Sequence, residues 1–219
     1  SVPGSFDETI ENIRRSIARD IPVVLSTVLT CHNAAELPDI VALADEIGAE
    51  YVVFNRYLGP DIPGLTLSPS GLQETLGQVE IMRNQGRRVR YGNCIPQCFT
   101  PNASTGCLAG VAYCAVDPQG NVKPCTCSTL RAGNLLKQPL AEVWRAPAMQ
   151  AFRSAIDPAC HHCGAFAICH GGCKALALEQ SQSRDPLIMR PNVVHPRPSV
   201  HTVRLDPHLR PLGRFKIRV

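Results

Sequence analysis

Seven cysteines between residues 107 and 173 form two groups whose spacing could hold metal. The first group is Cys107, Cys114 and Cys125, and the second is Cys160, Cys163, Cys169 and Cys173. Thiolates are soft ligands that select zinc, copper(I) or iron–sulfur clusters. A Cys-x2-Cys turn such as that of Cys160 and Cys163 lets two thiolates hold one metal centre. The pattern therefore predicts a cysteine-ligated metal module between residues 107 and 173.

Zinc is the main alternative to an iron–sulfur cluster at these cysteines. Four-cysteine zinc sites usually pair two Cys-x2-Cys turns, whereas this chain has one, at Cys160 and Cys163. The looser spacing of the other cysteines favours a larger cluster, and Gly164, Gly171 and Gly172 leave room for it. Spacing alone favours iron–sulfur over zinc by only about two to one, because short motifs discriminate weakly between metals. A disulfide framework is weaker still.

The charge, the apolar content and the cysteine count limit the classes of protein to which this chain could belong. The 219 residues carry a net charge of +4, and the basic residues are not interleaved with aromatic ones, so we expect no nucleic-acid partner. No apolar run could span a bilayer and no signal peptide opens the chain, which predicts a cytoplasmic protein with no membrane contact. Eleven cysteines in a reducing compartment favour metal binding. The absence of an initiator Met suggests a fragment.

Helical and strand patterns alternate before the cysteine groups. Periodicity predicts helices over residues 6–19, 35–47 and 68–85, and apolar runs predict strands over residues 22–30, 51–54 and 88–91. The run from Val23 to Leu29 suits a strand that is buried on both faces. This alternation is typical of parallel βα units, so the predicted fold class is α/β. Three strands cannot bury such a sheet alone, which predicts the trailing part of an α/β barrel.

The pattern changes after residue 92. Residues 116–122 are predicted to form a β-hairpin, and residues 140–155 a short helix. After residue 180 the chain is rich in Pro and Arg with little apolar content, so we expect a solvated tail that links or wraps. The expected domains are residues 1–92, the βα part; residues 93–180, the cysteine module; and residues 181–219, the basic tail.

The order of the cysteines, with one glycine, resembles a known family. Cys107, Gly120 and Cys125, followed by the group Cys160–Cys173, match the SPASM auxiliary-cluster pattern of radical S-adenosylmethionine (SAM) peptide maturases. The phrases Val-Asp-Pro-x-Gly-Asn-Val-x-Pro-Cys and Cys-His-Gly-Gly-Cys, which end the two groups, are also typical of that family. The resemblance covers residues 1–180 and implies the C-terminal βα units of a partial radical SAM barrel, followed by a small cysteine-rich auxiliary iron–sulfur domain.

The resemblance implies two auxiliary [4Fe-4S] clusters with separate ligands. By position, the first would be held by Cys107, Cys114, Cys125 and Cys173, and the second by Cys160, Cys163 and Cys169. The family's remaining ligand is a cysteine after the last motif, and none follows Cys173 here. We expect Cys127, two residues past Cys125, to take that place. The alternatives are Cys94, Cys98, or a site completed by His161, His162, water or substrate.

The resemblance also implies a radical-generating site that these residues do not form. That site needs a Cys-x3-Cys-x2-Cys triad, and Cys94-x3-Cys98 imitates only its start because Pro101 stands in the third place. We therefore expect SAM and a third [4Fe-4S] cluster to be bound mainly by a missing N-terminal half, and the fragment alone to be inactive. Cys94 and Cys98 are then family-specific cysteines of the connecting loop, or packed thiols without a ligand role.

Three polar residues lie just beyond predicted strands, where residues of a barrel face its active site. Asn33, Asn55 and Arg56 are therefore candidates to bind the cofactor. Arg56 could instead meet a peptide carboxylate or lie on the surface. No residue is assigned a catalytic role.

The resemblance implies that the intact protein is a radical SAM enzyme that modifies a ribosomally made peptide. Its expected partners are that peptide, a peptide-recognition domain or protein, and a reductant such as flavodoxin or ferredoxin. Sulfatase maturases place Asp after the cysteine that matches Cys125, and Thr126 stands there in this chain, which favours the peptide branch. The alternatives are maturation of a protein side chain, of the sulfatase or quinohaemoprotein type, and a non-catalytic iron–sulfur or zinc module for electron transfer or binding.

Overall fold

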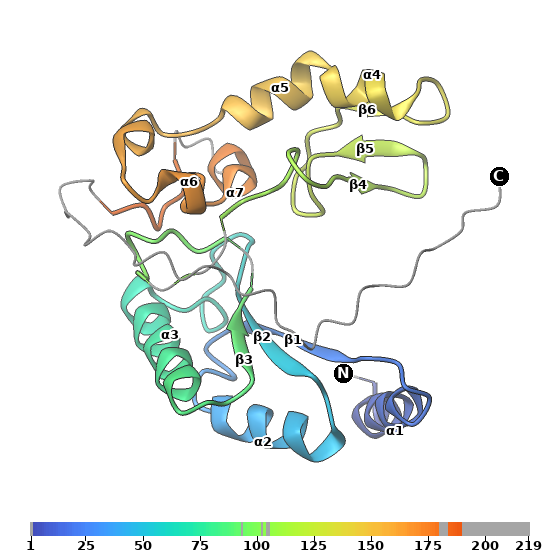
Figure 1. The fold of residues 1–219 in the computed structure, drawn as a ribbon, viewed down its shortest axis with the longest axis vertical. Coiled ribbons are helices and arrows are strands. Elements are labelled where there is room, and N and C mark those ends of the chain that lie inside the picture. The colour runs from blue at the N-terminus through green and yellow to red at the C-terminus, as the bar shows by residue number, and fades with distance from the viewer. Residues whose placement is uncertain (1, 93, 102, 104–105, 180–183, 190–219) are drawn as a thin grey trace.

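The computed structural model describes residues 2–92, 94–101, 103, 106–179 and 184–189 of the chain. It has two parts: a sheet with its helices, and a smaller module that lies over the ends at which the strands finish (Figure 1). Most of the expected basic tail, residues 190–219, falls outside the described residues. Within the described ranges, no helix is long and apolar enough to cross a membrane.

Helices and parallel strands alternate in the first part, as the sequence predicts. The elements are α1 (Ser5–Ile17), β1 (Val24–Leu29), α2 (Leu37–Ile47), β2 (Tyr51–Arg56), α3 (Pro69–Asn84) and β3 (Val89–Tyr91). The strands form one sheet in the order β1-β2-β3, with Val24 opposite Tyr51 and Val52 opposite Val89. Because the three strands run parallel, their carboxyl ends reach the same edge of the sheet, and the residues that follow them gather there.

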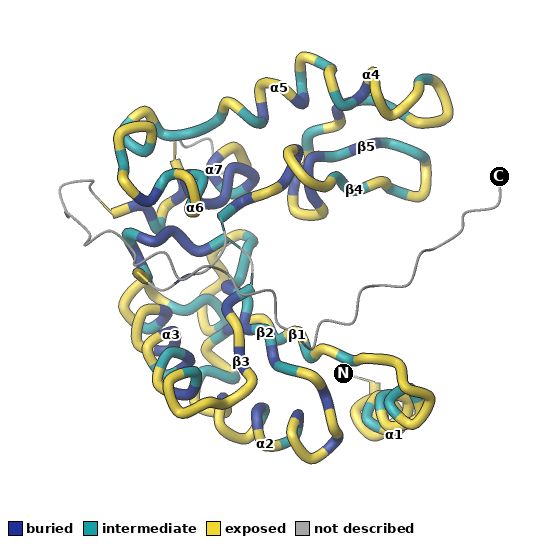
Figure 2. Tube along the Cα trace, in the orientation of Figure 1, coloured by how far each residue is buried: buried dark blue, intermediate teal, exposed yellow. Residues whose placement is uncertain are grey.

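The helices cover one face of this sheet. Val52 and Phe54 of β2 are buried in a core that they share with Val41 of α2 and Leu76 of α3. Figure 2 shows these buried positions along the strands and along the facing sides of α2 and α3. Side chains alternate across a strand, so Asn55, the neighbour of Phe54, turns to the opposite face.

The prediction that the first strand is buried on both faces is wrong. Val24 and Val28 of β1 are 38% and 45% exposed, whereas Leu29 is buried. β1 is an edge strand of the described sheet, and only its residues that alternate with Val24 and Val28 turn toward the helices. A continuous apolar run reveals the strand, but it does not reveal whether the layer that should cover the second face is present.

Local sequence explains where two of the helices begin and end. The side chain of Ser68 accepts a hydrogen bond from the Gly71 backbone N–H at 3.1 Å, and Pro69 occupies the first turn of α3. Both features are typical of a helix start. Gly48 ends α2 with a φ of 81°, in the left-handed region where glycine is favoured. These signals predicted both helices to within about two residues.

The second part is a small antiparallel sheet surrounded by short helices. Its elements are β4 (Ala115–Val116), β5 (Asn121–Lys123), β6 (Gly133–Asn134), α4 (Leu140–Arg145), α5 (Pro147–Ser154), the 3₁₀ helix η1 (Pro158–His162), α6 (Phe166–Cys169) and α7 (Lys174–Glu179). The predicted hairpin is confirmed, with Val116 opposite Val122. Its turn is held by Asp117, whose carboxylate accepts from the backbone N–H groups of Gln119 at 3.0 Å and Asn121 at 2.9 Å.

The single helix predicted over residues 140–155 is two helices. Ala146 has an extended ψ of 144° and separates α4 from α5. The cause is Pro147, because a proline disfavours the helical conformation of the residue before it. The break leaves Val143 and Met149 fully buried in one small core with Val122.

A buried ion pair joins the two parts. Arg56, the last residue of β2, and Asp185, which follows the cysteine module, form a two-pronged pair in which Arg56 is 2% exposed and Asp185 1% exposed. The same carboxylate accepts hydrogen bonds from the backbone N–H groups of Cys173 at 2.6 Å and Leu187 at 2.9 Å. Residues 184–189 are therefore part of the folded body, unlike the solvated tail that we expected there.

We expect Asp185→Asn to lower the free energy of unfolding by about 3–5 kcal/mol, because it leaves the buried Arg56 guanidinium without a countercharge. The measurement is a urea titration followed by circular dichroism. The double variant Arg56→Met/Asp185→Leu should recover a large part of the loss, since it removes both charges.

The matched control is Asp45→Asn. Asp45 pairs with Arg87 and Arg88 at 3.0 Å on the surface, and an exposed pair contributes no more than about 1 kcal/mol. Equal losses in Asp185→Asn and Asp45→Asn would show that the buried pair does not hold the two parts together.

Candidate metal centre

A cavity lined by five cysteines lies between the sheet and the module. Its volume is about 550 Å³. The thiol-bearing residues that line it are Cys94, Cys107, Cys125, Cys127 and Cys173. Ser26, Val28 and Asn55 line its opposite side from β1 and β2. The cavity therefore lies between the cysteines and the face of the sheet that the helices do not cover.

Cys94 is central to the first group of cysteines. Its thiol is in hydrogen-bond contact with the thiols of Cys107 and Cys173. Those contacts lower the pKa of Cys107 and of Cys173, and they raise the pKa of Cys94. Burial raises the pKa of Cys125 to about 11. The four sulfurs thus lie in one mostly buried region in which each influences the charge of the others.

A second group forms around Cys169. The Cys160 thiol has its pKa raised to about 11, first by burial and then by Asp157 and the neighbouring Cys169, Cys98 and Cys163. Burial also raises the pKa of Cys98, which lies within electrostatic reach of Cys169 and Cys163. The backbone N–H of Gln97 points to the Cys169 sulfur at 3.5 Å. Four cysteines, Cys98, Cys160, Cys163 and Cys169, therefore gather outside the first cavity.

Three residues with left-handed backbone separate the two groups. His170, Gly171 and Gly172 have φ values of 55°, 79° and 74°. This conformation is costly for most side chains and easy for glycine, and it turns the chain between Cys169, in the second group, and Cys173, in the first. A side chain at Gly172 would also collide with Asp185. The Gly-Gly pair thus directs Cys169 and Cys173 to different groups of cysteines.

The two groups touch through their backbones. A Cβ atom on Gly106 would collide with the backbone of Ile168 and Cys169. The His170 ring lies between the carbonyl oxygens of Cys107, at 3.3 Å, and Ala167, at 2.9 Å. His170 therefore links the chain at one group to the helix that carries the other.

The predicted ligands fall into place unevenly. Cys107, Cys125 and Cys173 line the first cavity, and Cys160, Cys163 and Cys169 lie together in the second group. Cys114 instead packs against the small core that includes Val122 and Val143. Cys127, expected to complete the second set, lines the first cavity. Cys94 and Cys98, for which the sequence left a ligand role open, lie one in each group.

The three candidate cofactor-binding residues have different surroundings. Asn33 serves the local turn: its side chain accepts from the Thr30 N–H and donates to the Val28 carbonyl, each at 2.9 Å. Asn55 donates to Ser26 at 2.9 Å and lines the cavity. Arg56 is buried and paired with Asp185 instead of lying on the surface. Of the three, Asn55 is the one whose side chain borders the cavity.

The donor set fits iron–sulfur clusters. Iron–sulfur clusters are held by cysteine thiolates, and the first cavity offers five thiols with space between them and the sheet. Among the described residues, no three His, Cys, Asp or Glu side chains converge closely enough to hold a single metal ion. Tyr113, which the sequence analysis did not single out, also borders this cavity, and burial raises its pKa to about 12.

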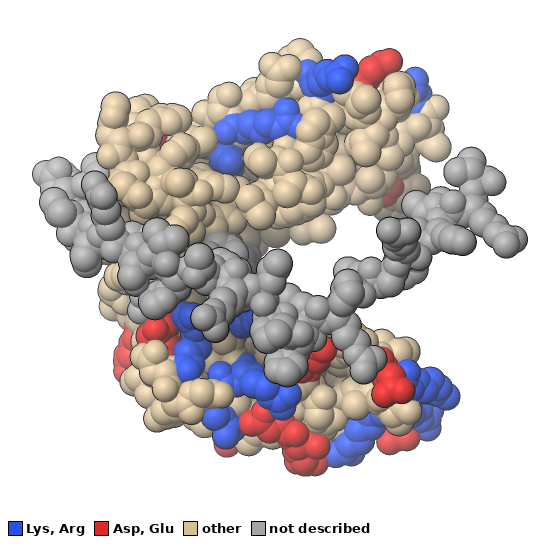
Figure 3. Space-filling model, in the orientation of Figure 1, with Lys and Arg blue, Asp and Glu red and all other residues tan. Residues whose placement is uncertain are grey.

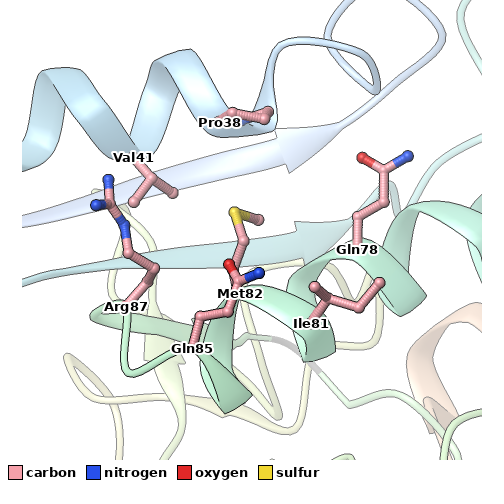
Figure 4. A pocket seen from close by; sticks show the side chains of 7 residues that line it. All are labelled: Pro38, Val41, Gln78, Ile81, Met82, Gln85 and Arg87. Atoms are coloured by element: carbon pink, nitrogen blue, oxygen red, sulfur yellow. The ribbon is translucent and has the colours of Figure 1, made fainter.

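A second hollow of about 370 Å³ lies between α2 and α3, away from the cysteines (Figure 4). It is lined by Pro38, Val41, Gln78, Ile81, Met82, Gln85 and Arg87. These described side chains include no thiol, imidazole or carboxylate. Figure 3 shows that the charged side chains on this face of the molecule gather mainly over the βα part, whereas the module is largely neutral. The cysteine-lined cavity is therefore the site to explain.

Comparison with known proteins identifies the module. Residues 107–164 match the SPASM family, an iron–sulfur cluster-binding domain. A PqqA peptide cyclase from Xanthomonas axonopodis pv. citri is 31% identical over 179 residues, which are 75% of this chain and 48% of the relative. An AdoMet-dependent heme synthase from Methanosarcina barkeri is 26% identical over 203 residues, 80% of this chain and 57% of the relative. The chain thus spans about half the length of these relatives.

A solved structure shares the fold across both parts. Streptococcus suis SuiB bound to its precursor peptide SuiA superposes with a TM-score of 0.64 at 17% identity, over 83% of this chain and 48% of SuiB. The fold and the cysteine site thus define an iron–sulfur cluster-binding protein of mixed α/β architecture. More particularly, the chain belongs to the radical SAM/SPASM family, and its relatives include peptide maturases.

We expect Gly106→Ala to reduce the iron content of the reconstituted protein and to lower its free energy of unfolding by about 1–3 kcal/mol, the usual cost of forcing extra atoms into a packed site. The added methyl group would push residues 106–107 away from the Cys169 backbone. Iron analysis and urea titration measure the two effects.

Gly77→Ala is the control. Gly77 lies in α3 with open space where a Cβ would be, so the variant should keep its iron and gain roughly 0.5–1 kcal/mol of helix stability. Unchanged iron and stability in Gly106→Ala would contradict a tight contact between the two cysteine groups.

Proposed function

We propose that this chain is the C-terminal half of a radical SAM enzyme that modifies a ribosomally synthesised peptide, with two auxiliary [4Fe-4S] clusters in residues 93–180. The observation that carries the proposal is the shared cavity, in which Cys94, Cys107, Cys125 and Cys173 face Asn55 at the carboxyl end of β2. In a βα sheet, ligands bind at the carboxyl ends of the strands. A cluster placed there lies beside the substrate region.

The sheet supports the same proposal. In β1 and β2 the helices cover one face, while Ser26, Val28 and Asn55 line the cavity on the other. This is the arrangement expected of the last βα units of a partial barrel, with helices outside and the active site inside. The strands that would complete the barrel, the third [4Fe-4S] cluster and most SAM contacts belong to the proposed upstream half.

The residues of this chain have three roles in the proposed reaction. The cysteines hold the clusters, which when bound supply one-electron transfer or a position for the substrate. Asn55 offers an amide beside the cavity, where it can orient a bound peptide or cofactor. Burial of the surrounding chain limits the access of water to the clusters, which is the contribution that a protein makes to radical chemistry.

The substrate assignment is supported by the relatives and by one residue of the cavity. One relative is named a peptide cyclase, and SuiB has been solved with a precursor peptide. Thr126 borders the cavity directly after Cys125, in the place where sulfatase maturases have Asp. A peptide therefore fits this site better as the substrate than a sulfatase does. A reductant such as flavodoxin or ferredoxin, and a peptide-recognition domain or protein, are the proposed partners.

The test is anaerobic reconstitution of the full-length protein, followed by incubation with SAM, a reductant and the peptide encoded nearest to its gene. We expect about twelve irons and as many sulfides per chain, from three [4Fe-4S] clusters, together with reductive cleavage of SAM and a mass change in the peptide.

Three outcomes would contradict parts of this proposal. Zinc without sulfide would refute the clusters altogether. Iron and sulfide without SAM cleavage would leave a non-catalytic electron-transfer module. Because one relative is a heme synthase, SAM cleavage that modifies a porphyrin precursor and leaves the peptide unchanged would replace the peptide as substrate.

A further inference from the structure

The loop after β3 carries two cysteines that reach different metal sites. Cys94 and Cys98 lie four residues apart, and a loop has no regular spacing that would force them to opposite sides. In the structure Cys94 contacts Cys107 and Cys173, whereas Cys98 lies with Cys160, Cys163 and Cys169. The second group reaches four cysteines only when Cys98 of the loop is counted, and at the first group the loop adds Cys94 to the four other cysteines that line the cavity.

At the first site the contacts favour Cys94 over its competitors. Cys94 borders the same cavity as Cys107, Cys125 and Cys173 and touches two of them directly. Cys114 packs into the small hydrophobic core beside Val122 and Val143. Cys127 borders the cavity but is exposed. Cys94 is the candidate whose sulfur is already in contact with those of two other ligands.

At the second site the loop lies against Cys169. The Gln97 backbone N–H reaches the Cys169 sulfur at 3.5 Å, which brings the adjacent residue Cys98 to the same group. Thiolate ligands of iron–sulfur clusters are commonly surrounded by such backbone N–H groups, which tune the cluster's reduction potential.

We propose that this loop supplies one ligand to each auxiliary cluster. Cys94 joins Cys107, Cys125 and Cys173 at the first cluster, and Cys98 joins Cys160, Cys163 and Cys169 at the second. The assignment rests on the proposed function only in taking both sites to hold iron–sulfur clusters. In this assignment Cys98 takes the place of the cysteine that would follow Cys173, and Cys114 and Cys127 lie outside both ligand sets.

The consequence is that one short loop fixes the two clusters relative to each other and to the sheet. The loop begins just after β3, whose Val89 and Tyr91 are buried in the sheet core. Residues Ile95 and Phe99, which alternate with the two cysteines, are buried in that same core. The apolar residues thus anchor the loop, while Cys94 and Cys98 project to the two sites.

The test is anaerobic reconstitution of the full-length protein and of its Cys94→Ala, Cys98→Ala and double variants, with iron and sulfide counts and electron paramagnetic resonance of the reduced clusters. We expect each single variant to lose about four irons and one of the two auxiliary signals, a different signal in each case. The double variant should lose both signals and keep the signal that SAM perturbs.

Serine variants separate ligation from folding. In Cys94→Ser and Cys98→Ser an oxygen replaces one sulfur ligand at nearly the same size, so we expect a shifted signal for one cluster and an unchanged signal for the other. Loss of structure alone would not shift a single cluster selectively. The control is Cys31→Ala, because Cys31 is exposed and its thiol lies beside the Thr66 carbonyl at 3.2 Å.

The outcomes distinguish this inference from the proposed function. If the unmodified protein binds no iron and sulfide, the proposed function fails. If it binds the expected clusters and the Cys94 and Cys98 variants keep both auxiliary signals unshifted, while Cys114→Ala or Cys127→Ala loses one, the loop assignment is overturned and the proposed function stands.

Discussion

The buried pair between Arg56 and Asp185 is the interaction on which the arrangement of this protein depends. A guanidinium at the end of β2 and a carboxylate beyond the cysteine module are both removed from water, and each compensates the charge of the other. The carboxylate also accepts from the Cys173 backbone N–H. One charge pair thus holds the end of the sheet, Cys173 and the segment of residues 184–189 in a single position.

Short segments that bury few apolar residues of their own bring the cysteines together beside this ion pair. The hairpin delivers Cys125, the left-handed turn at Gly171 and Gly172 separates Cys169 from Cys173, and the anchored loop after β3 brings Cys94 and Cys98. Metal-binding modules of this kind commonly gain much of their folding free energy from the metal itself. The protein's contribution is to place thiols around two centres and to set one of them against the open face of the sheet.

The sequence patterns predicted which helices and strands form better than they predicted what packs against them. Capping by Ser68 and Gly48, and the turn at Asp117, are local interactions, so the corresponding elements were predictable. The burial of β1 was mispredicted because its apolar run says nothing about what covers it. The helix over residues 140–155 was mispredicted because its periodicity outweighed Pro147, whose effect on Ala146 is also local and was available from the sequence.

The sequence by itself determined the family resemblance, and through it the expectation of iron–sulfur chemistry, and it singled out six of the cysteines that gather in the structure, because residue type and order are written in the chain. The tertiary structure alone decided that Cys94 and Cys98 divide between the two sites, that Cys114 packs in a core, and that Arg56 is buried against Asp185, 129 residues away. Pairings of this kind depend on which distant segments meet. Local spacing carries no information about such meetings, since they are set by packing across the whole fold.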